Sequence, residues 1–179
     1  MLTYTYVDNS NVFIEGQRVS AVNRGMAIDI YDAIYREIFD LTFQIDYGKL
    51  HQFVCGEEKS IGSAKLWGSP PPHDTFWKMV EAKGFKVTTY KNSYGKEKKV
   101  NTSIAYHTAK DIRKIDKSNS EICLVAGDKD FVPVVEDLVS EGFRVAVYFW
   151  EHAARELKEA ATSFTSLTPW LEHLKFNRL

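Results

Sequence analysis

The most constraining feature of the sequence is residues 124–131, LVAGDKDF, in which a short apolar run meets a glycine and then two carboxylates. The run is typical of a buried strand, and Asp128 and Asp130 follow it directly after Gly127. Residues 131–142 then have apolar positions at helical spacing, with a proline in the first turn and a glycine at the end. Strand, acidic turn and helix predict one β-α unit, and ligands bind at the strand ends of such units.

The rest of the chain repeats this alternation of strands and helices. We expect strands at residues 2–7, 60–67, 85–90, 121–126, 144–149 and 164–167. We expect helices at residues 12–25, 27–39, 46–55, 74–82, 101–115, 131–142 and 152–161. This alternation predicts an α/β fold, a three-layer α/β/α sandwich with a mainly parallel central sheet.

The 179 residues show no break in composition, so one domain is expected over residues 1–179. The tail, residues 168–179, is amphipathic and is expected to dock either onto this domain or onto a second copy, as a homodimer. With 23 basic and 24 acidic residues the net charge is −1, so any nucleic-acid binding must be local. No apolar run approaches the roughly 20 residues of a membrane span, and Cys55 and Cys123 lack metal-type spacing. We therefore expect a cytoplasmic protein with reduced cysteines and no membrane partner.

Four polar residues are expected to meet at one edge of the sheet. The C-terminal ends of parallel strands lie along one edge, which places Asp8, after the first strand, beside Asp128 and Asp130. Helices begin at the same edge, so Asn101, at the start of the helix predicted for residues 101–115, belongs to this group. On a 3.6-residue period Asn101 lies on the apolar face of that helix, so its side chain should point inward.

Three carboxylates and an amide oxygen at one place would repel one another unless a cation were bound. Oxygen ligands without His or Cys favour Mg²⁺ or Mn²⁺, with Asp8, Asp128 and Asp130 as the metal ligands. Such a cation can lower the pKa of water and neutralise charge on a phosphoryl oxygen, so the implied reaction is phosphodiester hydrolysis. The alternative is that the acids are plain caps, with Asp130 capping the helix that follows it.

Other side chains near this edge are expected to contact a nucleic-acid backbone. Lys96, Lys98 and Lys99 lie on the loop that leads into the helix of Asn101, although an ordinary solvated loop explains them equally well. Asn11 either orients Asp8 or touches a substrate phosphate.

Two further residues, Trp150 and His152, follow the fifth strand at the same edge. They would either contact a nucleotide or, in the simpler interpretation, pack in the core and cap a helix. No P-loop, dinucleotide-binding glycine motif, nucleophilic triad or zinc-type spacing is present in the sequence. Nucleophilic side-chain catalysis and dinucleotide binding are therefore disfavoured.

Three segments carry a resemblance to a known family: VDNSN at 7–11, KEKKVNTSIAYH at 96–107, and LVAGDKDFVPVVEDLVSEGFRVAVYFW at 124–150. On these segments the chain resembles the NYN domain family of PIN-like ribonucleases. The resemblance covers nearly the whole chain and implies a PIN-like fold and metal-dependent cleavage of RNA, single-stranded or structured. Carried over by position, it assigns the catalytic places to Asp8, Asn101, Asp128 and Asp130.

One of these positions departs from the family pattern, which has an aspartate where this chain has Asn101. An amide is neutral and leaves one negative charge less to hold a metal. The site is then attenuated, or it tolerates the change, or the asparagine is an engineered substitution that traps an inactive enzyme. The first hypothesis is an endoribonuclease, and the second is a catalytically degenerate module that binds RNA or a protein partner. Asp111, about 80° around the helix from Asn101, is kept as a candidate for a further acid of the site, and the favoured interpretation is a surface salt-bridge residue.

Overall fold

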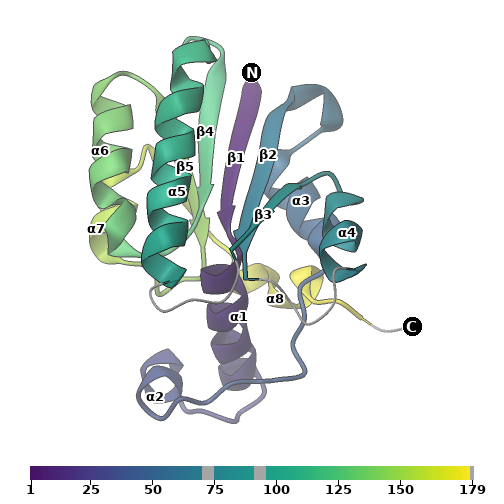
Figure 1. The fold of residues 1–179 in the computed structure, drawn as a ribbon. Helices are drawn as coiled ribbons and strands as arrows, with labels where there is room; N and C mark the ends of the chain where they lie inside the picture. Colours follow the sequence, from purple (N-terminus) through teal and green to yellow (C-terminus); the bar gives the residue numbers. More distant parts are fainter. Residues whose placement is uncertain (70–74, 91–95, 178–179) are drawn as a thin grey trace.

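The structure, a computed structural model, describes residues 1–69, 75–90 and 96–177, and of residues 96–99 the backbone only. Its centre is a single sheet of six parallel strands in the order β3-β2-β1-β4-β5-β6 (Figure 1). The strands are β1 (Leu2–Asp8), β2 (Ile61–Gly68), β3 (Lys86–Thr89), β4 (Ser120–Val125), β5 (Arg144–Phe149) and β6 (Ser163–Ser166). The predicted α/β class and parallel sheet are confirmed.

The strand order places a change of direction between β1 and β4. From β1 the chain adds β2 and β3 on one side, and it then returns to add β4, β5 and β6 on the other. The two central strands are paired along their length, from Leu2 opposite Ser120 to Val7 opposite Val125. In open parallel sheets the crevice at the C-terminal ends of two such strands is where ligands bind. Asp8 and Asp128 follow these two strands.

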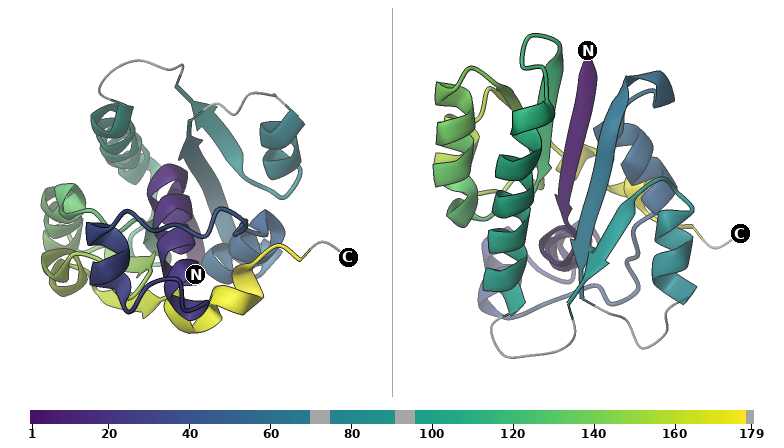
Figure 2. Two further views of the ribbon diagram at one scale, coloured as in Figure 1. Left: turned by 90° about the horizontal axis from the view of Figure 1, so that it is seen from below. Right: turned by 45° about the horizontal axis from the view of Figure 1, so that its top comes forward.

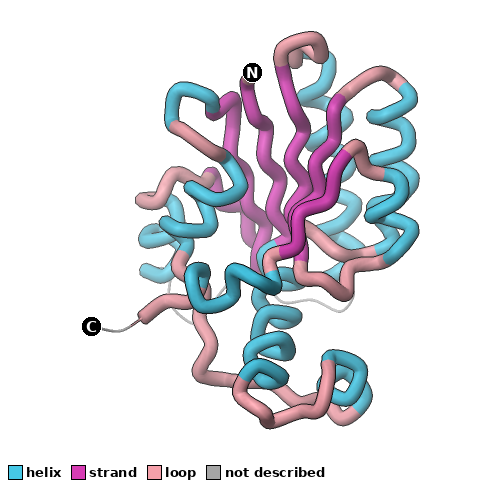
Figure 3. Tube along the Cα trace, turned by 180° about the vertical axis from the view of Figure 1, so that it is seen from behind, coloured by secondary structure: helices cyan, strands magenta, loops and turns pink. Residues whose placement is uncertain are grey.

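The helices cover both faces of the sheet and its lower end (Figures 1 and 3). The α-helices are α1 (Asn9–Asn23), α2 (Ile30–Tyr35), α3 (Tyr47–Cys55), α4 (Thr75–Glu81), α5 (Lys96–Asp111), α6 (Val132–Ser140), α7 (Arg155–Ala160) and α8 (Leu171–Leu174). The 3-10 turns are η1 (Glu58–Ser60), η2 (Ile112–Lys114), η3 (Lys129–Phe131) and η4 (Thr168–Trp170). Seen from below, α1 lies under the strand ends with α2 and α8 beside it (Figure 2).

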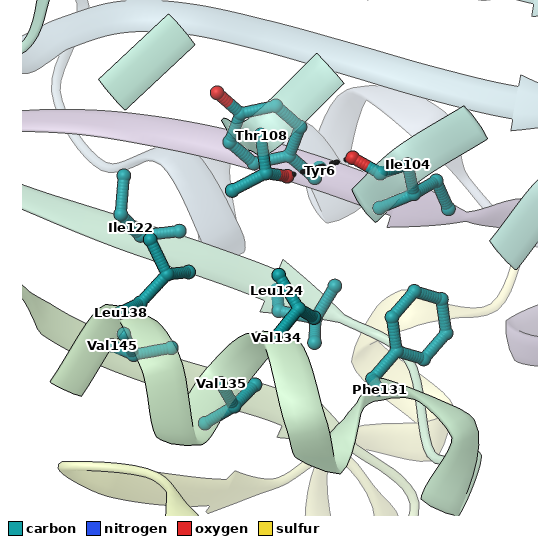
Figure 4. Close-up of a pocket in the computed structure, with 10 residues that line it drawn as sticks. All are labelled: Tyr6, Ile104, Thr108, Ile122, Leu124, Phe131, Val134, Val135, Leu138 and Val145. Atoms are coloured by element: carbon teal, nitrogen blue, oxygen red, sulfur yellow. Dashed lines mark hydrogen bonds between the residues drawn. The ribbon is translucent and has the colours of Figure 1, made fainter. Parts of the chain in front are cut away.

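The core consists of two apolar clusters, one on each face of the sheet. In the second cluster, strand residues such as Tyr6 and Leu124 pack against Ile104 of α5 and Val135 of α6 (Figure 4). Only about 10 Å³ of free space remains among these side chains, less than a comfortable site for one water. Close packing of this kind holds α5, and with it Asn101, in a fixed position against the sheet.

The predicted bounds of several helices were wrong. The helix expected at 12–25 begins earlier, at Asn9, because Asp8 caps it. The helix expected at 27–39 is confined to Ile30–Tyr35, because Asp29 caps its start by accepting the Asp32 N–H at 2.8 Å, and Glu37 adopts a left-handed conformation with φ of 53°. The helix expected at 152–161 is likewise shorter, at Arg155–Ala160. The helix expected at 101–115 begins earlier, at Lys96. The lysines at 96, 98 and 99 therefore belong to the first turn of α5 and not to a loop.

The C-terminal tail docks onto its own domain. Leu171 and Leu174 of α8 are buried, and α8 contacts α1 and α3. Lys175 forms an isolated antiparallel bridge with Ile45, and the Asp46 N–H donates to the Leu174 carbonyl at 2.8 Å. These contacts are those of the predicted docking onto the same domain. The predicted homodimer stays a prediction.

Candidate active site

A cleft of about 460 Å³ opens at the C-terminal ends of β1 and β4. Its walls come from α1, from the residue after β2, from α5 and from the turn after β4. The described residues that line it are Asp8, Ser10, Asn11, Ile14, Glu15, Arg18, Ser69, Val100, Asn101 and Asp128. The structure thus brings together four residues singled out from the sequence: Asp8, Asn11, Asn101 and Asp128.

Asp8 is both the last residue of β1 and the N-cap of α1. Its Oδ1 accepts the Asn11 backbone N–H at 3.2 Å, which satisfies one of the open donors at the start of the helix. The side chain is almost fully buried, with 6% of the residue exposed. Burying a carboxylate costs free energy unless hydrogen bonds or a cation compensate its charge. The strand-to-helix turn holds Asp8 in this buried position.

Asn11 holds the turn after β4 in place. Its Oδ1 accepts the backbone N–H of Gly127 at 3.0 Å, across 116 residues of sequence. A Cβ on Gly127 would lie 2.1 Å from Cδ1 of Phe149, so only glycine allows this approach. Because its side-chain oxygen makes this contact, the structure gives Asn11 a positioning role. The predicted RNA contact by Asn11 stays a prediction.

The two acids of the GDKD turn have different surroundings. Asp128 is half-buried and caps η3, with its Oδ1 accepting the Asp130 N–H at 2.9 Å. Asp130 is exposed and is not among the described residues that line the cleft. The predicted cap by Asp130 was therefore wrong, because Asp128 is the acid that caps this turn. The predicted metal binding by Asp130 stays a prediction.

The start of α5 forms the opposite wall of the cleft. Val100 is buried in the core, and Asn101 beside it is half-buried and lines the cleft, as its place on the apolar helix face predicted. The predicted RNA contacts of Lys96, Lys98 and Lys99 lie outside the described residues, because only the backbone is described there.

Glu15 and Arg18 of α1 also line the cleft, and the sequence analysis missed both. Glu15 contacts His152, with Oε2 and Nε2 2.6 Å apart, and it also forms a close ion pair with Arg18. The guanidinium of Arg18 lies 4.8 Å from the ring centre of Phe39, and its Nε is buried without a hydrogen-bond partner in the described structure. The signal was available, because Asn11, Ile14, Glu15 and Arg18 follow one another at helical spacing.

Trp150, His152 and Asp111 all have partners within the domain. Trp150 is fully buried and donates its indole N–H to the Val12 carbonyl at 2.8 Å, so its predicted core packing is confirmed. The predicted helix cap by His152 was wrong, because His152 contacts Glu15 and the N-cap of α7 is Ala154. A nucleotide contact by His152 stays a prediction.

Asp111 lies at the far end of α5, where it accepts the Tyr6 hydroxyl at 2.8 Å and pairs with Lys65. Burial would raise the pKa of the Asp111 carboxyl, but the hydrogen bonds from Lys65 and Tyr6 outweigh burial and lower it. The predicted salt bridge of Asp111 is confirmed.

A family model of the NYN domain matches residues 9–168 of the chain. The chain belongs to the NYN domain family. A solved structure with the same fold is a protein of unknown function, VPA0982, from Vibrio parahaemolyticus RIMD 2210633, with a TM-score of 0.64 and 21% sequence identity. The alignment covers 92% of this chain and 91% of the other. A comparison with curated protein sequences gives no match.

Members of the NYN domain family are generally nucleases and usually use divalent metals. The match over residues 9–168 confirms the resemblance to the NYN domain family, and it is consistent with a PIN-like ribonuclease. No helix in the described part of this NYN domain has the length and apolar character that crossing a membrane requires.

The oxygen atoms in the cleft of this NYN domain fit a hard divalent cation. Asp8 and Asp128 offer carboxylates and Asn101 offers an amide oxygen. Across the described residues, no three or more His, Cys, Asp or Glu side chains form a ready-made metal group. Mg²⁺ needs no such cage, because it is commonly held by one or two carboxylates together with water and substrate phosphates. The donor set is thus suited to a cation that binds together with a phosphate ligand.

Proposed function

We propose that this NYN domain is a metal-dependent endoribonuclease that hydrolyses RNA phosphodiester bonds. The observation that carries the proposal is that Asp8, Asn101 and Asp128 line one cleft at the change of direction between β1 and β4. The three residues come from three separate parts of the chain. Polar oxygens gathered at this point of a parallel sheet support a ligand site more than a structural role.

In this proposal the carboxylates of Asp8 and Asp128 and the amide oxygen of Asn101 hold Mg²⁺ or Mn²⁺. When bound, the cation supplies Lewis-acid chemistry, since it neutralises charge on phosphoryl oxygens and lowers the pKa of water. Asn11 ties the turn that carries Asp128 to the start of α1, which Asp8 caps. The substrate is then an extended RNA strand that passes along the cleft.

Arg18 supplies a fixed positive charge in the same cleft. A guanidinium can bind two oxygens of one phosphate through parallel hydrogen bonds. Its ion pair with Glu15, which His152 holds in turn, and its position against Phe39 limit the rotamers that Arg18 can adopt. We therefore assign to Arg18 the binding of the backbone phosphate whose bond is broken or of its neighbour.

A second candidate function is RNA binding without cleavage. The observation that favours it is the neutral amide of Asn101 in the cleft wall, where the family pattern has a carboxylate. With fewer negative charges the site binds a divalent cation more weakly, so the domain would still bind RNA but would no longer cleave it.

The test is cleavage of a labelled single-stranded RNA in Mn²⁺, in Mg²⁺ and in EDTA, with the Asp8→Asn and Asp128→Asn variants. Asp137→Asn is the matched control, because Asp137 is an exposed carboxylate on α6 that does not line the cleft. We expect metal-dependent cleavage that both cleft variants lose and the control keeps. Equal cleavage in EDTA, or by Asp128→Asn, would contradict the proposal. Binding without any cleavage would favour the second candidate.

A further inference from the structure

A second cavity, of about 520 Å³, adjoins the acidic cleft. Its walls come from the start of α1, from residues 44–47, from α4 and from the C-terminal tail. The volume lies within the range of about 300–1,000 Å³ that is usual for small-molecule sites. The lining is mostly apolar and aromatic, in contrast to the acidic and amide groups of the neighbouring cleft.

The two spaces share part of their walls. Ser10, Ile14 and Ser69 line both the acidic cleft and the second cavity. Ser10 is two residues after Asp8, and Ile14 precedes Glu15. A polymer whose phosphate lay in the cleft would therefore have its neighbouring unit at the mouth of the second cavity.

Three of the rings in the wall of the second cavity pack against one another. Phe76 contacts Tyr47 and Trp77 edge to face, with ring centres 5.6 Å and 4.8 Å away, respectively. The hydroxyl of Tyr47 donates to Asn9 Oδ1 at 2.7 Å, which fixes this ring. Phe176 lies at the exposed side, with 47% of its surface accessible. Its N–H donates to the Gln44 carbonyl at 2.8 Å, so the tail that carries it is anchored.

Nucleobases are flat and offer two faces for stacking on aromatic side chains. An apolar cavity lined by several rings therefore suits a nucleobase, whereas the polar cleft beside it suits a phosphate.

We propose that the second cavity binds one unstacked nucleobase of the RNA strand whose phosphate lies in the acidic cleft. Phe176 and Phe76 supply the aromatic contacts to the base. Recognition of single-stranded RNA through bases splayed onto aromatic side chains is a general mode. This inference rests on the proposed function and adds to it, because it makes the enzyme specific for single-stranded RNA at the point of cleavage.

The experiment measures binding of a short labelled single-stranded RNA in Mn²⁺ by fluorescence polarisation, with cleavage followed on a gel in parallel. The protein variants are Phe176→Ala and Phe76→Ala. Tyr35→Ala is the matched control, since Tyr35 is 89% exposed on α2 and lines neither cavity. A second series keeps the protein unchanged and removes one base at a time from the RNA, leaving the backbone intact.

We expect Phe176→Ala to bind the RNA about fivefold or more weakly, because stacking on one aromatic ring accounts for that much. Removal of one particular base should weaken binding to the unchanged protein similarly, and the two losses should not add. Tyr35→Ala should bind as the unchanged protein does.

The result that would overturn the inference is an affinity that no base removal and neither phenylalanine variant changes. If RNA is then still cleaved in Mn²⁺, the nuclease proposal stands without the base site. Base-dependent binding with no cleavage would support the base site and contradict the nuclease. A protein that binds no RNA would contradict both.

Discussion

The side-chain oxygen of Asn11 accepts a hydrogen bond from the backbone N–H of Gly127 at 3.0 Å. Asn11 lies in the first turn of α1, three residues after Asp8, and Gly127 immediately precedes Asp128. This one contact therefore ties the start of α1, which Asp8 caps, to the turn that carries Asp128. It links the segments that follow β1 and β4, where the strand order of the sheet changes direction.

Asn11→Ala removes the acceptor and leaves the Gly127 N–H without its partner. We expect the free energy of unfolding to fall by about 1 kcal/mol, measured by urea denaturation. RNA cleavage should fall by a larger factor, because the Asp128 turn is no longer held. Asn11→Asp keeps an acceptor oxygen and should retain more activity than Asn11→Ala. Equal activity of the unchanged protein and Asn11→Ala would show that the contact does not position the site.

Gly127→Ala introduces a Cβ where the ring of Phe149 already lies, 2.1 Å from Cδ1. Since Phe149 is fully buried in the core, the ring cannot move away freely. We expect a loss of about 1–3 kcal/mol in stability, seen in the urea midpoint. Combining Gly127→Ala with Phe149→Leu should recover part of that loss relative to the two single changes. Strict additivity of the two single effects would argue against the clash.

Asp40 stabilises the fold in a pH-dependent manner. Its buried carboxylate accepts hydrogen bonds from Thr42 at 2.6 Å, from Ser20 of α1 at 2.7 Å and from Arg24 at 2.8 Å. Burial would raise the pKa of Asp40, but these hydrogen bonds outweigh burial and hold the pKa well below its usual range.

A lowered pKa in the folded state means that the unfolded chain takes up the proton first. The contribution of Asp40 is thus complete above about pH 5 and is lost as the pH falls below about 4 towards the folded-state pKa. We expect Asp40→Asn to lower the free energy of unfolding by about 2 kcal/mol at pH 7. The stability of the variant should vary less with pH below about 4 than that of the unchanged protein. Parallel acid limbs in the two pH profiles of urea unfolding would contradict this assignment.

Arg18→Gln removes one positive charge from the described wall of the cleft. If Arg18 binds a backbone phosphate, the apparent KM of Arg18→Gln for RNA should be about tenfold higher than that of the unchanged protein. The KM of Arg18→Lys should lie between these two values, because lysine keeps the charge but lacks the planar guanidinium. Arg36→Gln is the control, since Arg36 is an exposed arginine at the C-cap of α2 that pairs with Asp32. An unchanged KM for Arg18→Gln would remove Arg18 from the proposed phosphate site.

The strand ends could be predicted from the sequence, because each depends on a local pattern. An apolar run stopped by an acid identified Asp8 and Asp128, and parallel topology brought them together. The 3.6-residue period placed Asn101 on the inner face of α5. The position of Asp130 was harder to predict, because a small change of position within a tight turn decides whether a side chain lines the cleft or is exposed to solvent.

Glu15 and Arg18 were missed because α1 lacks a clear apolar stripe and contains Gly16. A helix was predicted for residues 12–25, but glycine is disfavoured inside helices, so Gly16 weakened that prediction. In the structure it serves packing, since a Cβ there would lie 2.7 Å from Trp150 and 2.8 Å from Phe43. Both partners are distant in the sequence, so the reason for this glycine could not be inferred from local pattern.

The most direct measurement is the thermal midpoint of this chain and of its Asn101→Asp and Asp8→Asn variants, each with and without millimolar Mn²⁺. A cation that binds only the folded state raises the midpoint by mass action. We predict a modest rise for the unchanged chain and none for Asp8→Asn. For Asn101→Asp we predict a lower midpoint in EDTA, from carboxylate repulsion, and a much larger rise with Mn²⁺. Midpoints that Mn²⁺ leaves unchanged in all three proteins, or raises equally, would contradict a shared cation site formed by Asp8, Asn101 and Asp128.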